Sequence, residues 1–392
     1  MKIILVHNRY QQPGGEDVVF EQEKQLLQQR GHKVITYVRD NFEVHSYEGI
    51  RRLELASKTV WARDSRSNFS RLLRRERPDL VHVHNTFLMI SPSVYAACTE
   101  AQVPVVQTLH NYRLLCPAAT FFRHGSVCEE CVAQTLWRSV KHGCYRESRP
   151  ATATVALMLA FHRLRQTWSR DVASYIALSE FARKKFEAAH FTNKRIFVKP
   201  NFVYPDPGAR IGVGEYALFA GRLSPEKRVS VVLSAWRQLP NAIPLVIAGG
   251  GPDREKLEML CAENPKNKIT FVGCLPHAEL MRLMKGARML IFSSEWYESF
   301  PLTVVEAFAC GVPVVCSRLG AMEEQVENGR TGLTFIPGDS RDLANKVNWA
   351  CEHSEQLSNM GKEARKEYEA KYTADTNYPL LMRVYQHAIG AP

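Results

Sequence analysis

Two glutamates, Glu298 and Glu306, stand eight residues apart in the last third of the chain. The second lies in a short run, residues 303–309, that has the character of a helix and stops before a Gly-Val-Pro sequence. The positive N-terminal end of such a helix suits a phosphate. Carboxylates beside a phosphate site have a purpose if they bind sugar and ribose hydroxyls, so the pattern predicts a nucleotide-sugar pocket. The residues expected at the helix N-terminus are Ser299, Phe300, Leu302 and Thr303.

A cationic turn upstream strengthens this prediction. Arg222 and Lys227 follow a strand-like run and are five residues apart, across a turn that Pro225 stiffens. Two cations at the carboxyl end of a strand can offset the charge that develops on a diphosphate leaving group. An ordinary surface turn would contain the same residues, and the glutamate pair downstream is what favours the functional interpretation.

Several glycines and one histidine also follow strand-like runs. Gly251 ends a run of three glycines, and Gly273 ends another strand. Both would let the main chain approach a ligand, although a plain loop exit explains them equally well. Gly14 and Gly15 open a predicted helix and suit a phosphate or sugar loop. His110 ends a further strand and is expected to contact a sugar or an acceptor, where a structural histidine is the alternative.

Four of the ten cysteines form a cluster. A CxxC pair flanked by two more cysteines at similar distances is close to the spacing of a zinc ribbon. Because no secretory signal accompanies them, disulfides are not expected, and the alternatives are a structural zinc or a reduced, metal-free loop. Four thiolates leave no open position on zinc, so the metal would fasten an insertion at about residues 112–150 without doing chemistry. The candidate ligands are Cys116, Cys128, Cys131 and Cys144.

The elements that must position these residues alternate regularly along the chain. Short apolar runs, separated by amphipathic helix-length segments, occupy residues 3–6, 34–37, 80–83, 105–109, 175–177, 196–199, 216–220, 245–248, 269–272, 289–292, 312–316 and 332–335. This alternation predicts an α/β protein with parallel, doubly wound sheets covered on both faces. In such sheets ligands lie at the carboxyl ends of the strands.

The domain boundaries follow from composition. Three prolines and a glycine in residues 200–208 predict a linker. We therefore expect an N-terminal acceptor-side domain at residues 1–203 and a C-terminal nucleotide-sugar-binding domain at 204–374, both Rossmann-like and facing each other across a cleft. A final segment, 375–392, is expected to pack back on the first domain after a helix break between Thr373 and Pro379.

Charge is concentrated in the first half of the chain. Residues 1–200 carry 30 Lys and Arg against 18 Asp and Glu, and the remainder carry 21 against 22. The basic segment 51–77 is either a solvated helix face or a surface that attracts anionic lipid or a phosphate-bearing acceptor. No nucleic-acid module is recognised, so a nucleic-acid partner is not expected.

Segment 151–168 is either a buried interdomain helix or a lipid-docking surface. Its large apolar residues are Leu157, Leu159, Phe161, Leu164 and Trp168. The first residues resemble a strand rather than a signal peptide, and no apolar run is long enough to cross a bilayer. We therefore expect a cytoplasmic protein that contacts the inner face of the membrane peripherally.

Taken together, these residues resemble the family-4 glycosyltransferases of the GT-B fold, over nearly the whole chain. The resemblance rests above all on Glu298-x7-Glu306, supported by the Arg222 and Lys227 turn, the glycine loops and the strand that ends in His110. The stretch from His110 to Cys116, with the later CxxC, is similar to a bacterial surface-polysaccharide branch of the family.

The resemblance implies a reaction. Members transfer a hexose with retention of configuration, from a UDP-sugar or, less favoured here, a GDP-sugar, and usually without a metal ion in catalysis. The acceptor would be a glycan or a lipid-pyrophosphate-linked glycan. The implied roles are ribose binding by Glu306, donor-sugar binding by Glu298, diphosphate neutralisation by Arg222 and Lys227, loop closure on the phosphate at Gly15, and contact with the sugar near its reacting carbon by His110.

Two other functions fit part of the sequence. A nucleotide-sugar 2-epimerase on the same architecture would need the donor alone. A zinc-stapled protein that binds anionic polymers would explain the basic half and the cysteines, but it leaves the glutamate pair without a purpose.

Overall fold

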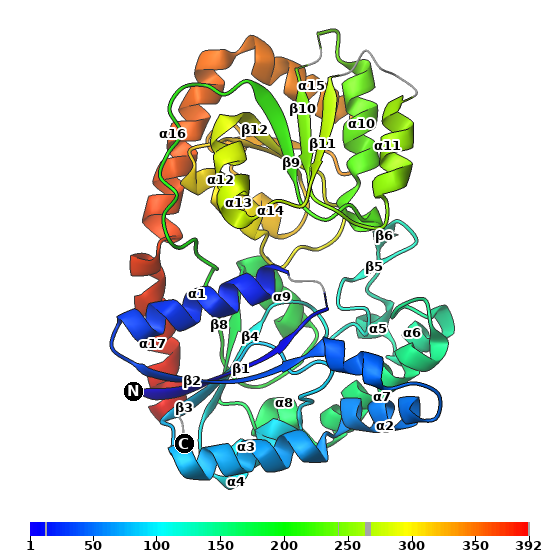
Figure 1. Ribbon diagram of the computed structural model, residues 1–392, viewed down its shortest axis with the longest axis vertical. Coiled ribbons are helices and arrows are strands. Elements are labelled where there is room, and N and C mark those ends of the chain that lie inside the picture. Colours follow the sequence, from blue (N-terminus) through cyan, green and yellow to red (C-terminus); the bar gives the residue numbers. More distant parts are fainter. Residues whose placement is uncertain (12–13, 242, 263–267, 391–392) are drawn as a thin grey trace. The chain divides into compact units, whose positions relative to one another are not determined.

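The computed structural model describes residues 1–11, 14–241, 243–262 and 268–390, which divide into two compact units. Unit 1 comprises residues 1–121, 128–201 and the chain from Asn377 onward, and unit 2 comprises residues 122–127 and 202–376. Each unit contains one six-stranded parallel sheet flanked by helices (Figure 1). The predicted α/β class with two doubly wound, Rossmann-like domains is therefore confirmed.

The sheet of unit 1 has the order β2-β1-β3-β4-β7-β8. Its strands are β1 (Lys2–Arg9), β2 (Lys33–Asp40), β3 (Leu80–Val83), β4 (Val105–Leu109), β7 (Ser174–Ala177) and β8 (Ile196–Val198). Helices on both faces bury the central strands, which is why β3 and β4 are continuous apolar or buried runs rather than alternating ones. The helices are α1 (Gly15–Gln29), α2 (Arg51–Val60), α3 (Arg63–Glu76), α4 (Ser93–Glu100), α5 (Glu130–Ala133), α6 (Trp137–His142), α7 (Arg149–Leu164), α8 (Thr167–Arg170), α9 (Glu180–Ala188) and α17 (Ala374–Gly390), with a 3-10 helix, η1 (Asn41–Ser46).

The sheet of unit 2 has the order β11-β10-β9-β12-β13-β14. Its strands are β9 (Tyr216–Ala220), β10 (Leu245–Ala248), β11 (Ile269–Gly273), β12 (Ala287–Phe292), β13 (Val314–Ser317) and β14 (Gly332–Phe335). The helices are α10 (Val229–Gln238), α11 (Arg254–Ala262), α12 (His277–Gly286), α13 (Leu302–Ala309), α14 (Ala321–Gln325), α15 (Ser340–Glu352) and α16 (Ser354–Lys371), with a 3-10 helix, η2 (Pro225–Lys227). Alternate residues of β9 enter two different cores: Leu218 packs with α12 and α13, and Phe219 packs with α10 and α15.

Every apolar run proposed as a strand coincides with an observed strand, and one further local feature was not expected. A short hairpin, β5 (Phe122–Arg123) with β6 (Ser126–Val127), lies inside the cysteine-rich stretch and groups with unit 2. The helix break predicted between Thr373 and Pro379 is confirmed at the start of that range, because α16 ends at Lys371 and α17 begins at Ala374. The hydroxyl of Thr373 accepts the N–H of Thr376 at 3.2 Å and so caps the new helix, and Pro379 lies inside α17.

None of the helices in the described ranges combines the length and apolarity needed to span a bilayer.

Candidate functional site

The carboxyl ends of β9 and β12 meet at the Lys227–Glu298 pair. Nζ of Lys227, at the end of η2, lies 2.5 Å from Oε1 of Glu298. The same oxygen accepts hydrogen bonds from Oγ of Ser294 at 2.8 Å and from Nε1 of Trp296 at 2.6 Å. Three donors on one oxygen hold this buried carboxylate in place. In the described part of the chain, Oε2 of Glu298 has no hydrogen-bond partner and is available to a ligand.

Glycines that follow the neighbouring strand β10 pack closely against the turn that carries Arg222 and Lys227. A Cβ on Gly249 would lie 1.9 Å from the carbonyl oxygen of Gly221, and one on Gly251 would lie 2.3 Å from that of Leu223. Only glycine allows the two loops to approach this closely. The turn presents Arg222 on the surface, where its guanidinium pairs with no other described residue. Arg222 is therefore a cation available to an anionic ligand.

Glu306 lies on α13 and contacts His277 at the start of α12. Oε1 of Glu306 is 2.9 Å from Nε2 of His277, and Glu306 is 5% exposed. The hydrogen bond raises the pKa of His277, against an opposing effect of partial burial. α13 begins at Leu302 without a side-chain cap, so the first N–H groups of this helix, those of Leu302 and Thr303, can bind an anion.

In unit 1, the His110 loop and the Gly14–Gly15 loop lie together at the carboxyl ends of β4 and β1. Nδ2 of Asn111 donates to Oε1 of Glu16 at 2.6 Å, which joins the two loops one residue away from His110 and Gly15. A Cβ on Gly14 or Gly15 would meet nothing within 4 Å. The start of α1 therefore has open space around it within the unit.

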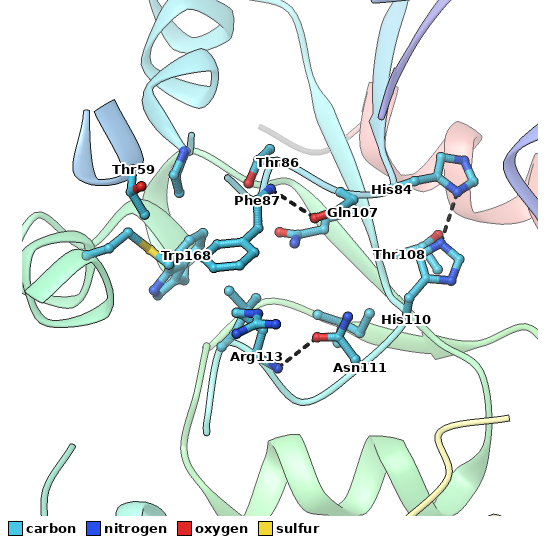
Figure 2. Close-up of a pocket in the computed structure, with 15 residues that line it drawn as sticks. Thr59, His84, Thr86, Phe87, Gln107, Thr108, His110, Asn111, Arg113 and Trp168 are labelled. Carbon is cyan, nitrogen blue, oxygen red and sulfur yellow. Dashed lines mark hydrogen bonds between the residues drawn. The ribbon is translucent and has the colours of Figure 1, made fainter. Parts of the chain in front are cut away.

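A pocket lies beside His110 in unit 1 (Figure 2). The rings of His84 and His110 are neighbours there, with Nδ1 of His84 3.0 Å from Nε2 of His110. Gln107, Arg113 and Trp168 each contribute a buried polar atom without a hydrogen-bond partner among the residues described. Buried polar atoms of this kind are satisfied by the hydroxyls of a polyol or by water. The pocket thus offers unpaired polar atoms to a hydroxyl group or to water.

The four clustered cysteines are close enough for their charges to interact. Burial, and then the charges of Cys116, Cys144 and Cys128, raise the pKa of Cys131 to about 12. Within the described ranges, no three of the four sulfurs lie within 4.8 Å of one another. The thiols are neighbours without being gathered at ligand distance, and a structural zinc stays a prediction.

The predicted site residues thus fall into two groups, one in each unit. The remaining predicted residues follow the strands of unit 2: Gly273 accepts the N–H of Gly249 at 2.8 Å, and Ser299 and Phe300 precede α13, where the Phe300 ring packs against Tyr372. The sequence interpretation missed His277 and Trp296. Their signal was their place directly after β11 and β12, where ligands of open parallel sheets bind.

Comparisons with known proteins agree with this geometry. Residues 13–206 match the family described as Glycosyltransferase Family 4, and residues 210–367 match Glycosyl transferases group 1. Glycogen synthase of Mycobacterium tuberculosis is 28% identical over 80% of this chain and 69% of its own length. O-antigen chain mannosyltransferase B of Escherichia coli is 34% identical over 32% of this chain and 33% of its own length.

A similar fold is found in Anabaena HepE, crystallised in complex with UDP-glucose. It aligns with a TM-score of 0.67 at 18% identity, over 98% of this chain and 100% of that one. Since the two family matches together span both units, the interpretation as a binding protein without transferase activity is not retained. The chain belongs to the family-4 glycosyltransferases and has the GT-B fold.

Proposed function

We propose that this glycosyltransferase moves a hexose from a nucleoside-diphosphate sugar, with UDP favoured over GDP, to a glycan or lipid-pyrophosphate-linked acceptor during surface-polysaccharide synthesis. The observation that carries the proposal is the contact of Lys227 with Glu298, with Glu306 on the helix that follows. A cation and two carboxylates at one sheet edge match the diphosphate, the sugar hydroxyls and the ribose hydroxyls of a single ligand. The UDP-glucose bound by HepE and the mannosyl transfer named for the Escherichia coli relative support this class of donor and product.

Each polar group has a defined task in this scheme. Glu306 binds the ribose hydroxyls, which replace His277 as its partner. Glu298 binds donor-sugar hydroxyls through Oε2, the oxygen that its protein neighbours leave open. Arg222 and Lys227 offset the diphosphate charge, and the first N–H groups of α13 bind a phosphate oxygen.

The chemical step is the departure of the nucleoside diphosphate from an oxocarbenium-like carbon. Charge grows on the leaving phosphate, so preorganised cations stabilise the transition state more than the ground state. The leaving phosphate accepts the proton of the acceptor hydroxyl on the same face, the new C–O bond forms on that face, and configuration is retained without a side-chain nucleophile. Gly15 lets its loop approach the phosphate, and His110 contacts the sugar near the reacting carbon. Arg222 and Lys227 supply the positive charge at the diphosphate, in keeping with catalysis that does not depend on a metal ion.

A lipid-linked acceptor would place the enzyme at a membrane, and one surface of unit 1 fits anionic lipid. Helices α2 and α7 pack together, and exposed apolar residues just before α2 and at the end of α7 have arginines as their sequence neighbours. Leu164 is 87% exposed and Ile50 is 83% exposed, next to Arg163, Arg165 and Arg51 in sequence. Apolar side chains ringed by cations are typical of peripheral docking to anionic lipid.

Two residues named for this surface from the sequence do not belong to it. Leu159 and Trp168 are buried in the core of unit 1, because they lie on the inward side of α7 and α8. Docking predicts flotation with liposomes that contain anionic lipid and loss of flotation in Leu164→Ser. Equal flotation with neutral liposomes would remove the proposed surface.

The transfer reaction is tested with two variants and a panel of nucleotide sugars. Binding of the correct donor raises the melting temperature of the folded protein. Lys227→Ala and Glu306→Ala are expected to keep the fold and lose transfer, because one removes charge at the leaving group and the other removes ribose binding. Transfer by purified Lys227→Ala at the parental rate would show that the leaving-group role is wrong. Donor incubated without acceptor separates transferase from 2-epimerase, since only an epimerase forms an epimer under these conditions.

A further inference from the structure

A buried cluster of ionisable residues lies behind His110 in unit 1, and the scheme above uses none of it. Glu23 comes from α1, His82 and His84 come from β3 and the residue just past it, and Lys199 follows β8. Each of these four side chains is at most 3% exposed. Ionisable groups buried this completely are costly unless they are paired, so their arrangement demands an explanation.

The cluster forms a continuous chain of contacts that ends at His110. Nζ of Lys199 lies 2.5 Å from Oε1 of Glu23 and 3.0 Å from Oδ1 of Asn377 on α17. Oε2 of Glu23 lies 3.2 Å from Nε2 of His84. Nδ1 of His84 then lies 3.0 Å from Nε2 of His110. Each contact joins a different segment of the unit, so the order Lys199, Glu23, His84, His110 is created by the fold.

The proton positions in this chain follow from charge and pairing. Burial alone would raise the pKa of Glu23, but Lys199 and His84 outweigh it and hold the pKa well below its usual value. Burial lowers the pKa of His84, which is therefore neutral. Oε2 of Glu23 and Nε2 of His84 make no hydrogen bond with any described residue, and their 3.2 Å approach is a close contact without hydrogen-bond geometry; Nδ1 of His82 lies 3.5 Å from the same oxygen. A carboxylate only accepts, and a ring lone pair facing it at this distance would be repelled, so the single proton of His84 is assigned to Nε2, on the side of Glu23.

The tautomer of His110 follows in turn. With its proton on Nε2, His84 offers only a lone pair at Nδ1, so the N–H between the rings must come from Nε2 of His110. Burial, and then the nearby His84, hold the pKa of His110 well below its usual value, so this ring is neutral and its Nδ1 carries a lone pair.

We propose that Glu23 is a positioning residue that acts through His84 to hold His110 as the neutral Nε2–H tautomer, so that Nδ1 of His110 accepts a hydrogen bond from the substrate. The assignment rests on the proposed function for its consequence in catalysis, but not for the tautomer itself. A nitrogen that accepts at this position orients a substrate hydroxyl through its proton, whereas an N–H there would require that hydroxyl to turn and accept instead.

A metal ion is the competing explanation for the cluster, because the candidate ligand atoms of Glu23, His82 and His84 lie within 4.8 Å of one another. The surroundings argue against a cation. The Lys199 ammonium already occupies one oxygen of Glu23. Both ring nitrogens of His82 are engaged, Nδ1 with the Tyr385 hydroxyl and Nε2 with the Thr108 hydroxyl, each at 2.8 Å.

The first test reads the parental protein and needs no substrate. Long-range ¹⁵N–¹H spectra of histidine-labelled protein report which ring nitrogen carries each proton, and loss of a signal in His110→Gln or His84→Gln assigns it. Both rings are expected to be neutral with the proton on Nε2. A proton on Nδ1 of His110, an imidazolium, or one equivalent of metal that is lost in His82→Ala would overturn the proposal.

The second test reverses the tautomer. In Glu23→Gln the ammonium of Lys199 retains the amide oxygen, so the NH₂ group must face Nε2 of His84, and both rings are expected to move their proton to Nδ1. In Glu23→Gln/Lys199→Met the amide is free to turn, and the parental tautomer is expected to return. Glu21→Gln, on the same helix and paired only at the surface with Arg9 and Lys24, is the matched control. Tautomers that stay parental in Glu23→Gln, or fail to return in the double variant, contradict the mechanism.

Transfer kinetics supply the functional readout. We expect kcat of Glu23→Gln to fall about 5- to 150-fold, because the reversed tautomer places the Nδ1–H of His110 against a buried hydroxyl that also donates. KM for the nucleotide sugar is expected to change little, and the double variant should recover part of the lost rate. A normal tautomer pattern with no transferase activity in the parental protein would contradict the proposed function and leave the positioning role of Glu23 standing. A reversed tautomer with parental kcat would refute the catalytic consequence alone.

Discussion

Replacement of Glu298 by glutamine is predicted to tighten UDP binding while it impairs transfer. Without ligand, Lys227 is held by Glu298, and a diphosphate must compete for that ammonium. The side chains of Lys227 and Glu298 are 17% and 9% exposed, so solvent screens the pair only in part. A hydrogen bond between charged groups contributes about 1.5–3 kcal/mol, and the glutamine oxygen would retain about 1 kcal/mol of it. The remaining 0.5–2 kcal/mol, roughly, corresponds to UDP binding about 2- to 30-fold tighter.

Calorimetric titration with UDP tests this prediction, because UDP lacks the sugar that Glu298 would bind. Glu298→Gln should bind UDP more tightly, Lys227→Ala more weakly, and Arg282→Ala, which removes an exposed arginine of α12, should match the parental protein. UDP-glucose should gain less than UDP in Glu298→Gln, since it loses the hydroxyl contact. Weaker UDP binding in Glu298→Gln would refute the reasoning: Glu298 would then hold Lys227 in its binding position rather than compete for it.

Three further predictions concern proton release, backbone packing and metal content. Because the pKa of His277 is raised by Glu306, the stability that this pair contributes is complete below the unfolded pKa of about 6.5 and is lost as pH rises through the folded value. Donor binding should displace His277 and release a proton, so affinity for UDP-glucose should increase between about pH 6 and 8, and the increase should vanish in His277→Ala. Gly249→Ala should lower the free energy of unfolding by about 1–3 kcal/mol, because the added Cβ would lie 1.9 Å from the carbonyl oxygen of Gly221. Gly329 also has a positive φ but open space around it, so Gly329→Ala is the control for backbone strain without a clash. Equal losses of stability for the two variants in chemical denaturation would contradict the role of the clash. Elemental analysis is expected to find one zinc per chain that is absent from Cys131→Ser and retained in Cys261→Ser; metal-free parental protein of full stability would end the zinc prediction.

The strands, and the start of the helix that carries Glu306 in unit 2, could be predicted from the sequence because their signals are local. A parallel strand buried on both faces is a short apolar run whatever lies beside it, and β9, Tyr216–Ala220, was predicted to the residue. Likewise, α13 was predicted to begin at residue 303 and begins at Leu302. The break between α16 and α17 was likewise predicted within the range from Thr373 to Pro379, and it falls at Thr373, whose hydroxyl caps α17.

The sequence alone determined the two α/β units, the family resemblance and the residues that carry charge at strand ends. The tertiary structure decided which of these residues meet. Lys227 and Glu298 are 71 positions apart, and Glu23 and Lys199 are 176 positions apart. Their contacts depend on the strand orders β9-β12 and β1-β3-β4-β7-β8, which bring distant segments side by side. Apolar periodicity encodes which face of an element is buried but not its neighbours, so the Glu23–His84–His110 chain and the His277–Glu306 pair became visible only in the folded protein.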